Sequence, residues 1–181
     1  MKNDKIARLL VTRKCEKHCD NCCNQLIGTQ YKAQYIDNLH PIRLYNIVCV
    51  TGGEPLLDWP RTQRILAQLH DRPDRVIYLY TTKCIPFMRN ILMMVSGVHF
   101  TLHHPLLVDD LNEFYEFQKI ISKSWKVFPK TFRLYIDQRI KTPIVIIPSV
   151  WSRVEVKPWE VNPPLPKDET LFILDEKYER E

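Results

Sequence analysis

Cysteine is concentrated near the start of the chain, where four of the six cysteines lie within nine residues: Cys15, Cys19, Cys22 and Cys23. The other two, Cys49 and Cys84, are isolated. In an intracellular protein such a cluster is typical of a metal site rather than of a disulfide framework. Three thiolates on one short loop can each bind one iron of a cubane iron–sulfur cluster and leave the fourth iron open for a ligand.

A structural zinc site is the alternative for the same loop. Zinc in a structural site closes its coordination shell with four protein ligands, and either His18 or Cys23 provides a fourth donor beside the three cysteines. The cysteines alone therefore leave iron–sulfur and zinc chemistry open. We expect Cys23 to be a packed thiol rather than a ligand, since free cysteine behaves as a small hydrophobic residue.

A second motif, Thr51-Gly52-Gly53-Glu54-Pro55, follows a predicted strand in a chain that has only four glycines. Paired glycines carry no side chains, so the backbone at Gly52 and Gly53 can approach a ligand closely. Glu54 beside them offers a carboxylate that can hold an ammonium group. A plain turn from strand to helix is the simpler interpretation of an isolated Gly-Gly pair.

The elements that must position these motifs alternate between strands and helices. Short β-branched or aromatic runs predict strands at Ile6–Thr12, Asn46–Thr51, Arg75–Thr82, Val98–His103, Phe132–Gln138 and Arg153–Lys157. The alternation predicts an α/β fold with parallel strands and right-handed crossovers. Six such units are too few for a closed eight-stranded barrel, so we expect a partial (β/α)6 TIM-like barrel, with its site at the carboxyl ends of the strands.

Three helices are predicted between these strands. Pro60 is placed for a first turn, and Pro73 stops the helix that follows it. Phe87–Ser96 is expected to be helical and to end at Gly97. A third helix is expected to begin at Asp110, which with Glu113 resembles a capping pair.

Residues 1–160 are predicted to form the barrel core, and residues 161–181 a Pro-rich C-terminal extension. Val161–Lys167 carries three prolines and predicts an extended loop. Leu171–Leu174 is expected to be a short edge strand or an arm.

The composition fits a globular protein of one domain. The 181 residues are 45% hydrophobic and 26% charged, ordinary values for a soluble chain. No apolar run approaches the length needed to span a bilayer, and no signal peptide is apparent, so we expect a cytoplasmic protein without membrane contact. The net charge of +5 is compatible with nucleic acid, an acidic protein or an anionic cofactor, and does not discriminate among them.

The spacing CxxxCxxC after the first strand, followed by GGEP after the second, resembles the radical S-adenosylmethionine superfamily. The resemblance implies that Cys15, Cys19 and Cys22 hold a 4Fe-4S cluster whose open iron binds S-adenosyl-L-methionine through its amino and carboxyl groups. It also implies that the backbone of Gly52-Gly53 and the side chain of Glu54 contact the amino end.

An activity follows from the same resemblance. Family members cleave S-adenosyl-L-methionine reductively to methionine and a 5′-deoxyadenosyl radical, which abstracts hydrogen from a substrate. The chain would then be an oxidoreductase that takes its electron from a donor such as flavodoxin.

Other strand ends supply further cofactor contacts that the resemblance implies. Thr101 or His103 is expected to reach a ribose hydroxyl, and Arg139 a carboxylate. The last predicted core strand leads to Trp159. In the family, the backbone of the corresponding strand contacts the edge of the adenine ring. The family also has an aromatic residue just before the third cysteine, whereas this chain has Asn21. Another side chain must then cover the adenine, for which Tyr78, Tyr80 and Trp159 are the candidates.

Two kinds of substrate fit a short member with a single cluster. Cys22-Cys23-Asn24 is similar to the local pattern of glycyl-radical activating enzymes, which implies a glycyl-radical enzyme as the partner protein. The TGGEPLL segment is similar to that of the 7-carboxy-7-deazaguanine synthases, which implies a small molecule or nucleotide substrate instead. A non-catalytic iron–sulfur or zinc-binding module is the remaining alternative.

Overall fold

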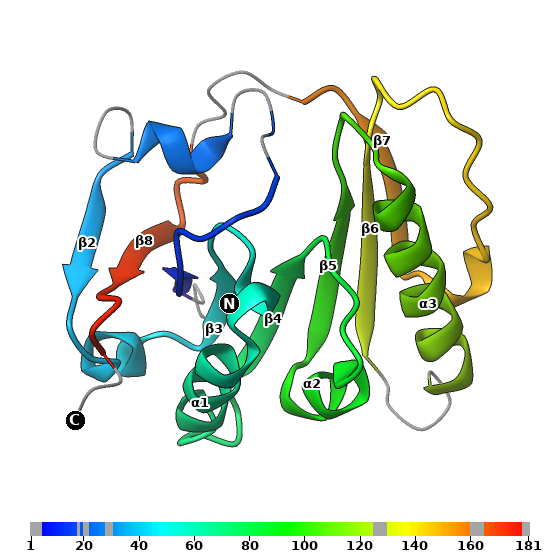
Figure 1. Ribbon diagram of the computed structural model, residues 1–181. Coiled ribbons are helices and arrows are strands. Elements are labelled where there is room, and N and C mark those ends of the chain that lie inside the picture. Colours follow the sequence, from blue (N-terminus) through cyan, green and yellow to red (C-terminus); the bar gives the residue numbers. More distant parts are fainter. Residues whose placement is uncertain are drawn as a thin grey trace.

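Among the residues that the structure describes, eight parallel strands form one sheet in the order β2-β8-β1-β3-β4-β5-β6-β7 (Figure 1). The computed structural model describes residues 5–17, 19, 22–27, 31–124, 130–159 and 165–178. The strands are β1 Ile6–Leu10, β2 Ala33–Ile36, β3 Ile47–Thr51, β4 Val76–Thr81, β5 Gly97–Leu102, β6 Thr131–Asp137, β7 Arg153–Lys157 and β8 Glu169–Leu174.

The α/β class and the parallel arrangement are confirmed, and all six predicted strands are present. In the part of the chain that the structure describes, the sheet has eight strands rather than six, and it is open, with β2 and β7 at its edges, so a TIM-like barrel is not confirmed. Strand direction rotates strongly across the sheet. In Figure 1, β2 and β8 point downward whereas β4 and β5 point upward, although every neighbouring pair is parallel.

The prediction of an edge strand or an arm at residues 171–174 was wrong. Strand β8 lies inside the sheet, with Ile6 of β1 beside Glu169 and Ala33 of β2 beside Leu171. The guanidinium of Arg8 also binds the Glu169 carboxylate through Nε–Oε2 at 2.6 Å and Nη2–Oε1 at 3.1 Å. The C-terminal segment therefore joins the first two strands.

The helices of the described residues are α1 Trp59–Leu69, α2 Met88–Met94 and α3 Val108–Ser124, with 3-10 turns η1 Cys23–Leu26, η2 His40–Leu44, η3 Pro55–Asp58 and η4 Pro148–Val150. Helix α1 carries Pro60 in its first turn, as predicted, and Asp58 caps it by accepting the Arg61 N–H at 3.3 Å. Gly97 does not end α2 but begins β5. Asp110 lies inside the first turn of α3 and accepts the Leu107 N–H at 2.9 Å.

The three helices pack on one face of the sheet. Apolar strand residues and apolar helix residues form one buried cluster, which includes Leu9, Val50, Leu79, Phe100, Ile65, Leu66, Ile91, Phe114 and Phe117. Helix α1 contacts α2, and α2 contacts α3. Because side chains alternate along a strand, the opposite face carries a different set, which we call the polar face: Arg8, Cys49, Tyr78, Tyr80, His99 and Arg133.

Helices in the described part of the chain are too short or too polar to cross a membrane.

Candidate functional site

The cysteine loop and the glycine motif lie side by side at the carboxyl ends of β1 and β3. The pairing of these strands continues beyond their ends, because Val11 donates its N–H to the Thr51 carbonyl at 2.9 Å. Gly53 then donates to the Thr12 carbonyl at 2.7 Å, and Glu54 to the Lys14 carbonyl at 2.8 Å. The backbone ladder thus ends one residue before Cys15.

The two glycines are required by this close approach of two backbones. A Cβ atom on Gly53 would lie 2.1 Å from the Lys14 carbonyl oxygen, and one on Gly52 would lie 2.5 Å from that of Thr12. Both separations are far inside van der Waals contact, so only glycine fits. The sequence led us to expect that these glycines approach a ligand; in the structure they approach the strand that carries the cysteines.

Asn24 closes the loop on its other side. This residue follows the third cysteine by two positions, and its Nδ2 donates to the Gly52 carbonyl at 3.1 Å. Gly52-Gly53 is therefore hydrogen-bonded to residues on both sides of the three candidate ligands: to Thr12, which precedes Cys15, and to Asn24, which follows Cys22. This contact was not predicted from the sequence.

Glu54 is buried, with 2% of its surface exposed. Its Oε1 accepts the Leu56 N–H at 3.0 Å and the Thr81 hydroxyl at 2.6 Å, and its Oε2 accepts the N–H and the hydroxyl of Thr82 at 2.8 and 3.0 Å. Burial raises the pKa of Glu54, and these hydrogen bonds oppose the increase. Because a carboxylate has about four acceptor positions, the side chain is engaged in joining the end of β3 to the end of β4.

The three candidate cluster ligands are half-buried, and none of them forms a disulfide bond among the described residues. Burial raises the pKa of Cys19 to about 11, and the charges of Cys22 and Cys15 add to the increase. Burial also raises the pKa of Cys15, with contributions from Glu54 and Cys22. The thiols are thus close enough to influence one another electrostatically.

No group of three metal-binding side chains converges among the described residues. The donor chemistry of three thiols on one loop suits a cluster. The other donors considered for a zinc site, His18 and the side chain of Cys23, lie outside the described residues, as does Asn21.

Ion pairs connect the cysteine loop to the neighbouring strand ends. Lys17 pairs with Asp110 in the first turn of α3, and both side chains are largely buried. Lys83, after β4, lies 2.9 Å from Glu16 Oε2 and 3.3 Å from Glu113 Oε1. The loop therefore extends from β1 toward the ends of β4 and β5.

His103 and Trp159, two of the predicted cofactor contacts, lie against each other. Their ring centroids are 4.5 Å apart at an interplanar angle of 83°, and Tyr135 lies 6.1 Å from the Trp159 ring. Burial lowers the pKa of His103 to about 4, and the charge of Lys17 lowers it further. The imidazole is therefore neutral at physiological pH, and its buried Nδ1 has no hydrogen-bond partner among the described residues.

Arg139 and Thr101 have different surroundings. The guanidinium of Arg139 binds the buried carboxylate of Asp137, with Nη2–Oδ2 at 2.8 Å and Nε–Oδ1 at 3.1 Å. About a third of the Arg139 side chain remains exposed, at 34%. Thr101 is half-buried and lies beside Tyr135 in the register of β5 and β6.

The polar face holds a chain of stacked groups that the sequence interpretation missed. The Arg8 guanidinium lies over the Tyr80 ring at 4.8 Å, the Tyr80 and His99 rings are 4.2 Å apart, and His99 meets Tyr78 at 5.8 Å. Arg133 completes the chain at 5.9 Å from the Tyr78 ring. The alternation of polar or aromatic residues with apolar ones along β4 and β5 is the sequence pattern that could have predicted this face.

Comparison of the chain with known protein families, with curated proteins and with solved structures gives no match.

Proposed function

We propose that the protein is a radical S-adenosylmethionine enzyme whose cluster-binding loop is Cys15–Cys22. The observation that carries the proposal is that the residues flanking this loop, Thr12 and Lys14 before it and Asn24 after it, are hydrogen-bonded to Gly52-Gly53-Glu54 at the ends of two adjacent parallel strands. Ligand sites of open α/β sheets lie outside the carboxyl ends of the strands. The cysteine motif and the glycine motif are separated by 29 positions, from Cys22 to Thr51. They therefore come together where a cofactor is expected.

Cys15, Cys19 and Cys22 would hold a 4Fe-4S cluster, and their half-buried position on one loop supports this. When bound, the cluster would supply the electron, drawn from a donor such as flavodoxin, that cleaves S-adenosyl-L-methionine to methionine and a 5′-deoxyadenosyl radical able to abstract hydrogen. Gly52-Gly53 fixes the loop, and Glu54 fixes Gly53 to the end of β4 through Thr81 and Thr82.

The wall of the cofactor site would be formed by His103 and Trp159. An indole and a neutral imidazole offer an apolar surface for an adenine ring, and the Nδ1 of His103 is available to a ribose hydroxyl. Thr101 is the second candidate for the ribose. The Arg139 guanidinium, already bound to Asp137, would offer its exposed edge to a carboxylate.

For the fold we propose a curled, partial barrel with the polar face inside. The rotation of the strands from β2 to β7 in Figure 1 supports a curled sheet. A second support is the composition of the polar face, since a parallel sheet with a solvated face is unusual and this face carries stacked aromatic and cationic groups.

Two substrates are proposed for the same chemistry. The segment Cys22-Cys23-Asn24 favours a glycyl-radical enzyme as the partner, as in the activating enzymes it is similar to. The polar face favours a small planar molecule, for example a nucleotide-like one as in the 7-carboxy-7-deazaguanine synthases. The observation behind this alternative is the aromatic cluster in which the His99 ring contacts the rings of Tyr80 and Tyr78.

Anaerobic reconstitution tests the proposal. The protein is incubated with iron and sulfide, reduced with dithionite and supplied with S-adenosyl-L-methionine, and 5′-deoxyadenosine is measured by mass spectrometry. We expect about four irons per chain and dithionite-dependent 5′-deoxyadenosine. Stoichiometric zinc without cleavage would show a non-catalytic metal module and overturn the proposal.

A pair of matched variants tests the ligand assignment. Cys19→Ala is expected to abolish cluster binding, whereas Cys23→Ala is expected to keep the iron content of the wild type. Loss of the cluster in the Cys23 variant would contradict the choice of ligands.

A further inference from the structure

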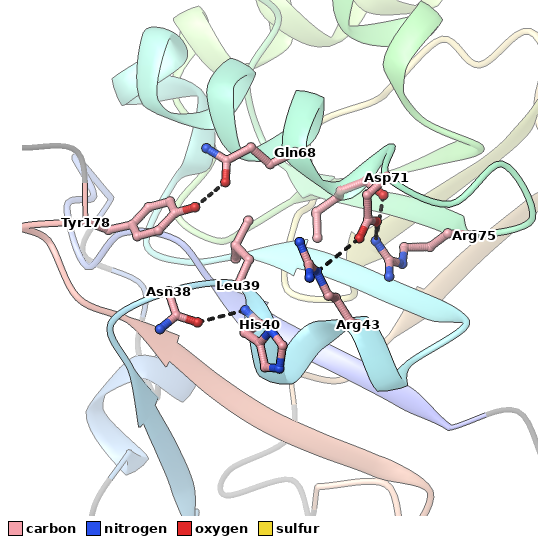
Figure 2. A pocket seen from close by; sticks show the side chains of 9 residues that line it. Asn38, Leu39, His40, Arg43, Gln68, Asp71, Arg75 and Tyr178 are labelled. Atoms are coloured by element: carbon pink, nitrogen blue, oxygen red, sulfur yellow. Dashed lines mark hydrogen bonds and ion pairs between the residues drawn. The ribbon is translucent and has the colours of Figure 1, made fainter. Parts of the chain in front are cut away.

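A cavity lies on the side of the sheet that carries α1 (Figure 2). Its volume is about 330 Å³, and three segments far apart in sequence form its walls. These are the connection from β2 into η2, the end of α1 with the loop after it, and the segment that follows β8. The cavity is of the smallest size that is typical of small-molecule sites.

Basic groups outnumber acidic ones in this cavity. Asp71 is the carboxylate among the lining residues, and two arginines share it. Arg75 binds Asp71 Oδ1, and Arg43 Nε lies 3.4 Å from Asp71 Oδ2. One carboxylate between two guanidinium groups leaves a net positive charge, and His40 on the same wall adds ring nitrogens that can form hydrogen bonds.

Arg75 has one nitrogen that is not satisfied. Its Nη1 donates to the Leu69 carbonyl at 2.7 Å, and its Nε donates to the Tyr45 carbonyl at 3.3 Å. The third nitrogen, Nη2, has no hydrogen-bond partner among the described residues. It is also shielded from solvent, because the Arg75 side chain is only 1% exposed. A buried charged donor without a partner is rare in native proteins, so this nitrogen indicates that an acceptor is missing.

The walls of the cavity are fixed by contacts that do not involve the basic groups. Arg61 donates to the carbonyl oxygens of Asp175 at 2.7 Å and Glu176 at 3.1 Å and so anchors the segment after β8 to α1. The Tyr178 hydroxyl bonds to Gln68 across the cavity, as Figure 2 shows. The cavity is thus preorganised, which lowers the entropic cost of binding.

We propose that this cavity binds a small phosphate-bearing molecule, with the phosphate placed between Arg43, His40 and Arg75. Arginine is the side chain best suited to phosphate, because its planar guanidinium can donate two parallel hydrogen bonds. Arg43 can reorient toward a phosphate, since 63% of its side chain is exposed. Asp71 would still be paired with Arg75 after Arg43 had moved away from it. The ring of Tyr178 and the amide of Gln68 supply a surface for the rest of the molecule.

Isothermal titration calorimetry on the full chain without a cluster tests the proposal with three probes: inorganic phosphate, AMP and adenosine. Phosphate is expected to bind when titrated at constant ionic strength, and AMP to bind at least as tightly. Adenosine is expected to bind at least about ten-fold more weakly than AMP, because it lacks the anion. Absence of binding by both phosphate and AMP, or equal affinities of AMP and adenosine, would overturn the proposal.

Variants assign the binding to this cavity. Arg43→Gln is expected to lower the affinity for AMP about ten-fold or more, whereas Arg89→Gln, which removes an exposed charge from α2, is the matched control and is expected to leave it unchanged. Trp159→Ala is the control for AMP bound at the proposed S-adenosylmethionine site. Equal losses in Arg43→Gln and Arg89→Gln, or a loss in Trp159→Ala alone, would contradict the assignment.

Discussion

Gly53 donates its backbone N–H to the Thr12 carbonyl oxygen at 2.7 Å. A Cβ atom on this glycine would lie 2.1 Å from the carbonyl oxygen of Lys14, two residues further along the same segment. The contact is between two backbones, so it depends on the absence of a side chain rather than on any functional group. The position of Cys15 thereby depends on a residue of the neighbouring strand end.

Gly53→Ala is therefore expected to destabilise the fold and displace the cysteine loop. The added methyl group overlaps a carbonyl oxygen that cannot move without breaking the ladder, so we expect a loss of roughly 3 kcal/mol in the free energy of unfolding. Urea denaturation of the metal-free protein measures it. Asn90→Ala, an exposed site on α2, is the control, and a Gly53 variant as stable as this control would show that the backbones can separate.

Glu54→Gln is expected to weaken the connection between the ends of β3 and β4. The amide keeps the shape of the side chain but replaces one acceptor oxygen with a donor, which then faces the N–H or hydroxyl of Thr82 or Thr81. A loss of about 2 kcal/mol is expected, and Thr82→Val should lose less because one of the four hydrogen bonds is removed. A Gln variant of wild-type stability would contradict this expectation, because it would show that the two side-chain oxygens do not both need to accept hydrogen bonds.

His99 should make the protein sensitive to acid. Burial lowers its pKa from 6.5 to about 4, and the charges of Arg133 and Arg8 contribute. The unfolded chain then binds the proton more tightly than the folded one, so stability is complete above pH 6.5 and is lost as the pH falls toward about 4. His99→Gln is expected to remove about 2 kcal/mol of this pH dependence, a value reduced for the partial exposure of the ring.

The measurement is urea denaturation at neutral and at mildly acidic pH, with the exposed His70 replaced by Gln as the control. If the free energy of unfolding of the His99 variant falls on acidification as much as that of the wild type and of the His70 variant, His99 does not contribute to the pH dependence.

A double-mutant cycle on Arg8 and Glu169 measures how strongly β8 is attached to β1. Their ion pair is only 22% and 11% exposed, so removing one partner leaves a poorly solvated charge. Arg8→Met or Glu169→Gln alone is expected to cost about 3 kcal/mol. The double variant should cost less than the sum of the two, and strictly additive losses would show that the pair contributes nothing beyond its separate side chains.

Trp159→Ala tests the cofactor wall that we propose. If the indole covers the adenine, the variant should keep the iron content of the wild type and show a KM for S-adenosyl-L-methionine raised about ten-fold, equivalent to about 1.4 kcal/mol of lost binding. Tyr35→Ala, at an exposed aromatic residue of the edge strand β2, is the control. An unchanged KM in the Trp159 variant would exclude the indole from the site.

The sequence was informative where local pattern decides structure. The strands β1 and β3 to β7 are runs of β-branched and aromatic residues, and Pro60 marks the first turn of α1. Strand β2 was missed because Ala33–Ile36 is short and half polar. The position of β8 could not be predicted, because periodicity identifies a strand but not its neighbours.

The candidate site was predictable only in part for a similar reason. Gly52 and Gly53 were recognised as a close approach, but the partner of that approach, residues 12–14, is set by the strand order. The contact of His103 with Trp159 joins strand ends 56 positions apart and follows from the sheet, not from either residue. Three of the four hydrogen bonds of Glu54, those from Thr81 and Thr82, likewise depend on β4 lying next to β3.

The interior position of β8 also bears on the order in which the protein can be made. Strand β1, which leads into the cysteine loop, has β3 on one side early in synthesis, but its other neighbour consists of residues 169–174. While those residues are still inside the ribosome, β1 is an edge strand and β2 has no partner strand among the described residues. The sheet around β1 is thus completed only after residues 169–174 have been made, so a chain that stops before them would leave the cysteine loop beside an open sheet edge.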